Sequence, residues 1–339
     1  MPLKQAVHQH LRKLLLGATD LPAACDISLH FPQHEIKVWL HGKNIPCDVT
    51  FRHSIVCTAP FLFCIGFDPE DRSQLLQGSV ATLRFEENTG RRNLLGEIEV
   101  RLTKILPVEE HTMALFEAVQ ARNLCISNLR LAAHDLFNRY AAWKNPGKNE
   151  VKVSQLGSAC NAIGFICPRP VVLVSVQDQD SGSIFPMNLF GHLGGEYFAF
   201  ALTSRRQAAP LVERIRRLAL STVPLEQAPT VRKLAGNHYV QAIDWSQLPF
   251  PLKTSKRLGL PIPGFAIRVY ELQVCDAQPL GSHTFFLAKI LHAETNTIQP
   301  EFNMIHGHYA AYRRLSVQDK LQRQTPSPLP VELAETTKR

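Results

Sequence analysis

The stretch from residue 164 to residue 223 constrains the fold of this chain more than any other part. Residues 171–176 form an apolar, β-branched run that is too short for a helix and is typical of a buried strand. Asp, Ser and Gly gather in a turn at 177–182, and a second strand pattern covers 197–202. Apolar residues at helical spacing follow at 208–218. This stretch therefore predicts antiparallel strands followed by a helix.

Short motifs accompany these elements and continue toward the end of the chain. They are Arg169-Pro170-Val171, Gly182, Pro186-Met187-Asn188-Leu189-Phe190, Ser204-Arg205-Arg206, Gly281-Ser282-His283 and Gly307-His308-Tyr309. In this order they resemble the flavin reductase-like, FMN-binding split-barrel family over about residues 150–315. Three positions depart from the family pattern: Asn188 stands where Ser is usual, Ser282 where Asp is usual, and Gln207-Ala208 where a Thr is frequent.

The resemblance implies a set of functional residues. It implies FMN contacts, with FAD as an alternative, at Arg169, Pro186, Met187, Asn188, Leu189, Ser204, Arg205, Arg206 and His308. It places His283 and His306 near the flavin as catalytic candidates and makes NAD(P)H a transient co-substrate. It also implies a homodimer with the flavin near the subunit interface, although the first half of the chain offers an alternative cover for that surface, which would leave a monomer.

The residue types agree with flavin chemistry. Arg205, Arg206 and the Ser204 hydroxyl precede a predicted helix, where charged donors and free backbone N–H groups bind phosphate. Residues 185–190 offer an apolar wall for an isoalloxazine ring, and Asn188 offers a hydrogen bond. The competing interpretation is that the arginines form a solvated helix face.

The histidines have a competing structural interpretation too. A histidine between apolar strands is commonly a hydrogen-bonded core residue, which applies to His283, His306 and His308. His306 and His308 on one strand would also point to one face as a metal pair. The carboxylates available nearby to complete a site are Glu294 and Glu301, and no metal is expected.

The formal net charge of +8 is uneven along the chain. Residues 1–150 carry 17 Lys and Arg against 16 Asp and Glu, whereas residues 151–339 carry 20 against 13. A basic second half suits an acidic ligand such as a flavin phosphate or a dinucleotide. Nucleic acid is unfavoured because no basic stripe with interleaved aromatic residues is present. The eight cysteines lack metal-ligand spacing, and no apolar run reaches the length of a membrane span, so we expect a cytoplasmic protein.

The first half has a different pattern. Residues 3–16 predict an amphipathic helix, and strand patterns follow at 27–31, 36–40, 49–51, 61–67, 80–85 and 95–106. Residues 108–143 contain no proline or glycine and predict a helical segment. The polar turn at 144–149 marks the domain boundary. A diverged duplication would explain two β-rich halves, but no residue matches show one.

We therefore expect a mainly β chain with helices, of the α+β class. An antiparallel β domain at 1–145 with its helical segment would precede a split β-barrel at 150–315 and a polar, proline-containing tail at 316–339, expected to be disordered. The favoured function is an FMN-binding oxidoreductase that transfers hydride between nicotinamide and flavin. The alternative is a non-catalytic module that holds flavin or haem and has a partner or regulatory role.

Overall fold

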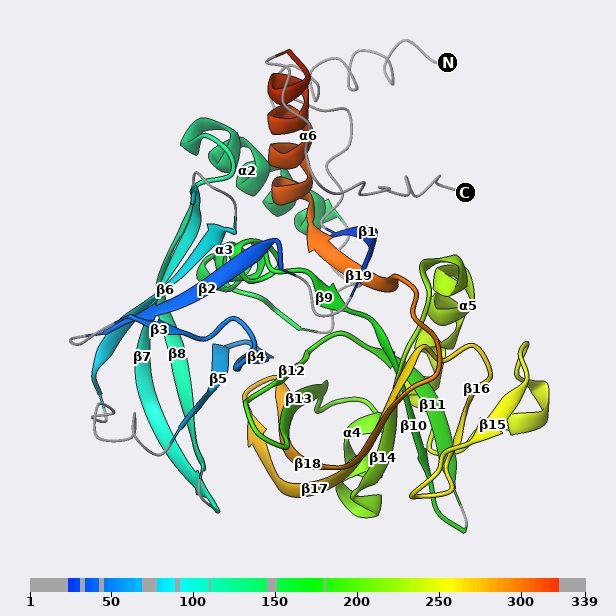
Figure 1. The fold of residues 1–339 in the computed structure, drawn as a ribbon. Helices are drawn as coiled ribbons and strands as arrows, with labels where there is room; N and C mark the ends of the chain where they lie inside the picture. The colour runs from blue at the N-terminus through cyan, green and yellow to red at the C-terminus, as the bar shows by residue number, and fades with distance from the viewer. Residues whose placement is uncertain are drawn as a thin grey trace.

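The computed structural model describes residues 24–30, 34–42, 46–68, 78–88, 92–109, 111–144, 151–179 and 181–322. The helix expected at 3–16, the turn at 145–149 and residues 323–339 of the expected tail lie outside these residues. Two seven-stranded antiparallel sheets dominate the structure and lie side by side (Figure 1). The mainly β, α+β fold expected from the sequence is confirmed.

The first sheet belongs to the first half of the chain, and its strand order is β3-β2-β6-β7-β8-β5-β4. Its strands are β2 (Ile36–His41), β3 (Cys47–Asp48), β4 (His53–Thr58), β5 (Phe61–Phe67), β6 (Val80–Glu87), β7 (Leu94–Val108) and β8 (His111–Asn123). The helix α2 (Asn128–Lys144) follows β8.

The second sheet has the order β11-β10-β14-β17-β18-β13-β12. Its strands are β10 (Val172–Gln177), β11 (Gly182–Met187), β12 (Phe190–His192), β13 (Tyr197–Thr203), β14 (Arg217–Thr222), β17 (Arg268–Leu280) and β18 (His283–Thr295). The helix α4 (Ala208–Ile215) connects β13 to β14. When the seven strands of each sheet are numbered in chain order, both sheets have the spatial order 2-1-5-6-7-4-3.

The hydrogen-bond register repeats as well. The hairpin β7–β8 ends on the pair Val108 and His111, and the hairpin β17–β18 ends on Leu280 and His283. Both hairpins have two register shifts at corresponding positions: Glu99/Val100 and Leu102/Lys104 in the first, Glu271/Leu272 and Val274/Asp276 in the second. The residue after Val108 and the residue after Leu280 both have positive φ, 50° at Glu109 and 57° at Gly281. The two halves are therefore copies of one strand arrangement.

The remaining elements lie outside the two large sheets. A three-stranded sheet has the order β1-β19-β9 and combines β1 (Ala24–Leu29), β19 (Glu301–His306) and β9 (Arg169–Pro170). The other elements are α3 (Gln155–Gly164), α5 (Ala228–Lys233), α6 (Gly307–Gln322), the 3-10 turns η2 (Leu225–Gln227), η3 (Leu234–Tyr239) and η4 (Trp245–Gln247), and the hairpin β15 (Leu252–Thr254) and β16 (Pro261–Pro263). The helix α6 continues into the stretch expected to be an extended tail.

Each sheet curls around a short helix. In the second half, Leu211 and Val212 of α4 join the apolar core of their own sheet. In the first half this place is taken by α3, whose Cys160 and Ile163 lie in the core of the first sheet, although α3 lies beyond the expected domain boundary. Gly96 allows the approach, because a Cβ there would lie 2.8 Å from the Ile163 side chain. A further apolar cluster lies between the two sheets.

The helical prediction for 108–143 is wrong over its first part. Residues up to Val108 belong to β7 and residues 111–123 form β8, and α2 begins only at Asn128. The cause is burial of both faces of β8: Leu115 packs between the two sheets, and its neighbour Phe116 packs in the first barrel. A strand buried on both faces shows no polar alternation, so its apolar residues resembled a helical pattern.

Two smaller corrections concern element ends. The helix expected at 208–218 ends at Ile215, because Arg216 adopts a left-handed conformation with φ 58° and Leu218 already belongs to β14. Residues 49–51, expected as a strand, form the turn between β3 and β4. Within the residues described, no helix has the length and apolar character needed to cross a membrane.

Candidate functional site

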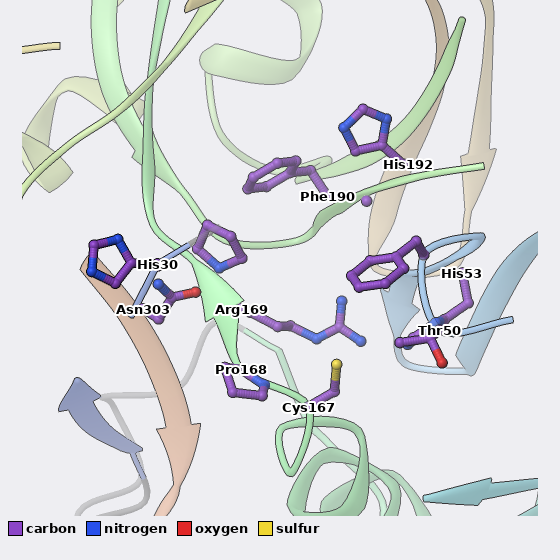
Figure 2. Close-up of a pocket in the computed structure, with 12 residues that line it drawn as sticks. His30, Thr50, His53, Cys167, Pro168, Arg169, Phe190, His192 and Asn303 are labelled. Carbon is purple, nitrogen blue, oxygen red and sulfur yellow. The ribbon is translucent and has the colours of Figure 1, made fainter. Parts of the chain in front are cut away.

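A partly open cavity of about 70 Å³ lies where the two halves meet (Figure 2). Its lining residues come from both halves. The first half contributes His30, Thr50, Phe51 and His53, and the second half contributes Cys167, Pro168, Arg169, Pro170, Phe190, Gly191, His192 and Asn303. Most of the lining is apolar or aromatic, and its charged group is Arg169.

Arg169 is the most unusual residue of this cavity. It lies on β9, opposite Met304 of β19, and only 4% of its surface is exposed. Its guanidinium lies 5.5 Å from the centre of the Phe165 ring, and its Nε and one terminal nitrogen have no hydrogen-bond partner among the described residues. Burial lowers the pKa of Arg169 to about 10, so the side chain is still a cation at neutral pH. A buried cation with free donors is costly unless an anionic or carbonyl group meets it.

His53 supplies a second polar group from the other half. Its Nδ1 lies 2.7 Å from the Val49 carbonyl oxygen, and its buried Nε2 has no hydrogen-bond partner within the part of the chain that the structure describes. Burial, and then the charge of Arg169, lower the pKa of His53 to about 4. The ring is therefore neutral, and because Nδ1 must donate to the carbonyl, Nε2 is an acceptor. The cavity thus combines a cationic donor with a neutral acceptor.

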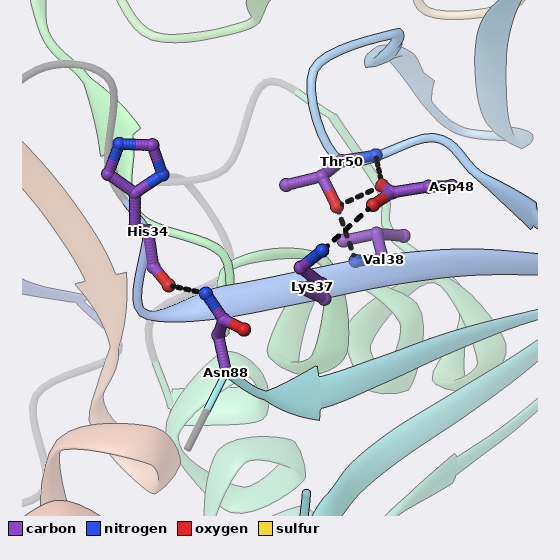
Figure 3. A network of polar contacts seen from close by, with 6 residues as sticks. All are labelled: His34, Lys37, Val38, Asp48, Thr50 and Asn88. Carbon is purple, nitrogen blue, oxygen red and sulfur yellow. Dashed lines mark hydrogen bonds and ion pairs between the residues drawn. The ribbon is translucent and has the colours of Figure 1, made fainter. Parts of the chain in front are cut away.

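The loop that carries Thr50 and His53 is held by a polar network (Figure 3). The Thr50 hydroxyl accepts from the Val38 backbone N–H at 2.9 Å, and the Thr50 N–H donates to Asp48 at 3.0 Å. Lys37 pairs with the same carboxylate at 3.3 Å. These bonds fix the turn after β3 against β2, so the first-half wall of the cavity is preorganised.

An aromatic wall completes the cavity. Phe190 lies on β12, and His192 packs on Phe198 with ring centres 3.9 Å apart. Burial lowers the pKa of His192 to about 4, so this ring is neutral too. Asn188, just before β12, donates from Nδ2 to the Met304 sulfur at 3.6 Å, beside the strand that pairs with Arg169. Pro186 and Met187 end β11, and Leu189 precedes β12.

The expected phosphate residues lie in the turn between β13 and α4. The Ser204 hydroxyl is 3.1 Å from the Thr284 hydroxyl, and Arg205 is exposed. The Arg206 guanidinium lies 5.1 Å from the centre of the Tyr239 ring. Since Ala201 N–H donates to the Leu189 carbonyl, this turn lies near the Asn188 end of the site. These three residues do not line the cavity itself.

The histidine candidates are separated by the fold. His283 is 5% exposed, and its Nδ1 lies 2.8 Å from the Ser282 hydroxyl and 3.8 Å from the Cys57 sulfur of the first half. Burial, with a smaller effect of Arg206, lowers the pKa of His283 to about 4. It lies next to the Ser204 turn but outside the cavity.

His306 and His308 lie elsewhere, at the junction of β19 and α6. The His306 and His308 ring centres are 4.5 Å apart, and His308 lies 4.9 Å from His134 of α2. Burial lowers the pKa values to about 4 for His306 and about 3 for His308. Neither residue lines the cavity. Among the described residues, no group of three or more His, Cys, Asp or Glu has a metal-binding arrangement.

Sequence reasoning missed the first-half residues Thr50, Phe51 and His53, and also His192 and Asn303. The pairing of strands identifies some of these positions, because it relates residues of the first half to residues of the second. Thr50 occupies in the first sheet the position that Asn188 occupies in the second, and His53 occupies the position of Phe190.

A seven-stranded antiparallel sheet curled around a short helix defines the second half as a split barrel. Residues 165–313 match the family model described as the flavin reductase like domain. A search of curated proteins gave no match.

Several solved structures are similar to part of the chain. One is an FMN-binding protein from Thermus thermophilus with bound p-hydroxybenzaldehyde, at 22% identity and TM-score 0.34, covering 38% of this chain and 73% of that one. Another is the NADH:FAD oxidoreductase SgcE6 of Streptomyces globisporus, at 15% identity and TM-score 0.40, covering 48% and 95%. A third is the styrene monooxygenase flavin reductase of Pseudomonas putida S12, at 17% identity and TM-score 0.34, covering 43% and 91%.

Proposed function

We propose that this chain binds a flavin, FMN or alternatively FAD, at the cavity between its halves and exchanges hydride with a reduced nicotinamide nucleotide. The observation that carries the proposal is Arg169, a buried cation inside a flavin reductase like domain, with two donor atoms that meet no partner among the residues described. Such an arginine favours a ligand that brings an electron-rich edge into a mostly apolar site.

The donor and acceptor groups fit one edge of a flavin. The pyrimidine ring of a flavin carries carbonyl oxygens and one N–H, and the cavity offers Arg169 as donor and His53 Nε2 as acceptor. A phosphate group fits less well there, because a neutral acceptor nitrogen repels a dianion and few donors are available. The ring edge is therefore assigned to Arg169 and His53.

The size of the cavity agrees with an edge rather than a whole ligand. Its volume of about 70 Å³ is well below the roughly 300 Å³ of a cavity that encloses a drug-sized molecule. The rest of the flavin would lie along the open side against Phe190 and past Asn188. The phosphate would then meet Ser204, Arg205 and Arg206 outside the cavity, where charged donors are exposed.

When bound, the flavin supplies the hydride chemistry. The residues of the chain bind and orient it and exclude water. Arg169 would stabilise negative charge at the edge of a bound flavin ring, and this would favour the reduced flavin. The side chains of Phe190 and His192 would keep water from that edge. The nicotinamide nucleotide has no binding domain of its own and would bind only transiently.

A second candidate function is a module that holds flavin or haem without nicotinamide turnover. The covering of His283 favours it: this residue was expected near the reacting groups, yet it is 5% exposed and packs against Cys57 of the first half. A cytoplasmic location stays a prediction. The homodimer that the family resemblance implies competes with a monomer covered by the first half of the chain, and the mass of the chain in solution decides between them.

The absorption spectrum of the purified chain, before and after addition of FMN and gel filtration, tests the proposal. Retained flavin absorbance supports flavin binding, and NADH or NADPH oxidation by the loaded protein then separates the oxidoreductase from the holding module. A colourless protein that retains no FMN and reduces no free flavin with NADPH would overturn the proposal, and so would tightly bound haem.

A further inference from the structure

The two halves of the chain face each other through the same positions. The apolar cluster between the sheets contains Leu62, Cys64, Met113 and Leu115 from the first half and Tyr197, Ala199, Phe285 and Leu287 from the second. The strand registers show that each first-half residue has an equivalent in the second half. The equivalent positions are Leu62 and Tyr197, Cys64 and Ala199, Met113 and Phe285, and Leu115 and Leu287. A contact in which one surface patch meets its own copy is the signature of a two-fold dimer interface.

The hairpin tips repeat this relationship. In the second half, Ser282 N–H donates to the Ala59 carbonyl in the β4–β5 turn, at 2.9 Å. In the first half, the His111 ring packs on Tyr197, at the end of the β12–β13 turn, with ring centres 5.7 Å apart. Each hairpin therefore reaches over the corresponding turn of the other half.

The two halves are not equivalent at the site. The strand pairings place Trp39 of the first sheet and Leu173 of the second at equivalent positions. Four residues before each of them stand Glu35 and Arg169, so Glu35 is the counterpart of Arg169. Glu35 forms an ion pair with Arg313 of α6 at 2.9 Å. Arg169, which forms no ion pair among the described residues, thus corresponds to Glu35, whose carboxylate is neutralised by Arg313.

We infer that the first half is a second copy of the split barrel that has replaced a partner subunit, so that one chain forms a complete two-barrel unit with a single ligand site. That site lies at Arg169 and is completed across the internal interface by Thr50 and His53. The Glu35–Arg313 pair closes the counterpart site. The position of the flavin in this inference rests on the proposed function, whereas the two-barrel unit does not.

The first test is the mass of the intact chain in solution, measured by light scattering with and without FMN. We expect the monomer mass of 38.0 kDa under both conditions. A dimer mass would overturn the replacement of the partner subunit, whether or not FMN binds.

The second test is the stoichiometry of FMN binding by equilibrium dialysis. We expect one FMN per chain, and His53→Leu in the first half should weaken FMN binding about tenfold, since one hydrogen bond is lost. Glu35→Gln is the matched control at the counterpart site and should leave affinity and stoichiometry unchanged.

Two FMN per chain, or an unaltered FMN affinity in His53→Leu, would overturn the single composite site. Absence of all FMN binding would overturn the proposed function and this site together, while the mass would still decide on the two-barrel unit.

Discussion

Arg169 and His53 come from different halves of the chain and line one cavity, where the charge of Arg169 helps to hold the pKa of His53 at about 4. The neutral state of His53 therefore depends on burial and, to a smaller extent, on the charge of Arg169. A ligand that brings a carbonyl to one and an N–H to the other would relieve both unpartnered groups.

Arg169 should lower the stability of the ligand-free protein. Its buried charge has no counter-ion in the cavity, and replacement of a buried charge by an apolar side chain of similar volume is commonly stabilising. We expect Arg169→Met to raise the free energy of unfolding of the ligand-free chain by about 1–3 kcal/mol in urea titrations. A marked loss of stability would mean that Arg169 has a structural role in place of a ligand-binding one.

The arginines before α4 should discriminate flavins by their phosphate. Replacing Arg205 and Arg206 together by Gln removes the charged donors of the proposed phosphate site. We expect FMN affinity to fall by about tenfold or more and riboflavin affinity to stay the same, since riboflavin has no phosphate. Isothermal titration with both ligands measures this, and an equal loss for both would contradict the assignment.

The buried histidines should make the fold sensitive to acid. His53, His192, His283 and His306 have pKa values lowered to about 4, mainly by burial, whereas histidine in the unfolded chain has its ordinary pKa of 6.5. Below pH 6.5 the unfolded chain binds protons that the folded chain does not, so stability falls as the pH decreases from about 6.5 toward 4.

Each such histidine contributes a slope of about 1.4 kcal/mol per pH unit within that window. Urea titrations at several pH values should therefore show a smaller slope for His53→Gln than for the natural chain. His34→Gln, at an exposed position, is the control. An unchanged slope in His53→Gln would show that His53 is not held neutral.

The contact between the halves should not tolerate a methyl group at Gly66. A Cβ at this position of β5 would overlap the carbonyl oxygen of Leu193, which follows β12, and a backbone group cannot rotate away. We expect Gly66→Ala to destabilise the chain by about 2 kcal/mol or more, as overpacking does. Gly42→Ala, with nothing within 4 Å of the new methyl group, should change stability by less than about 0.5 kcal/mol. Similar effects of the two variants would argue against this close approach.

The second half was the more predictable part of the fold. Its strands are separated by turns with clear residue signals, and its motifs occur in family order. Those motifs include Arg169 and Phe190, which line the cavity, whereas the functional roles of the segment 186–190 stay predictions. The first half has the same strand order, but its counterpart of Asn188 is Thr50, and the counterpart of Arg169 is Glu35. A duplication that keeps register while changing residues is visible only when the pairing of strands is known.

The composite character of the site was hidden for a related reason. His53 begins the short strand β4, and only the packing of β4 against β12 and β13 brings it to the cavity. His306 and His308, in contrast, occurred in a family motif, yet β19 and α6 carry them to His134. Proximity across sheets depends on long-range packing, which local patterns do not encode.

Titration of FMN and riboflavin into the natural chain, Arg169→Lys and Arg169→Met, followed by flavin fluorescence, tests the central claim most directly. We predict that Arg169→Met weakens both flavins by about 10- to 100-fold, because a charge-assisted hydrogen bond at the ring edge is lost, with a smaller loss in Arg169→Lys. An unchanged affinity in Arg169→Met, or a loss confined to FMN, would contradict the placement of the flavin ring at Arg169.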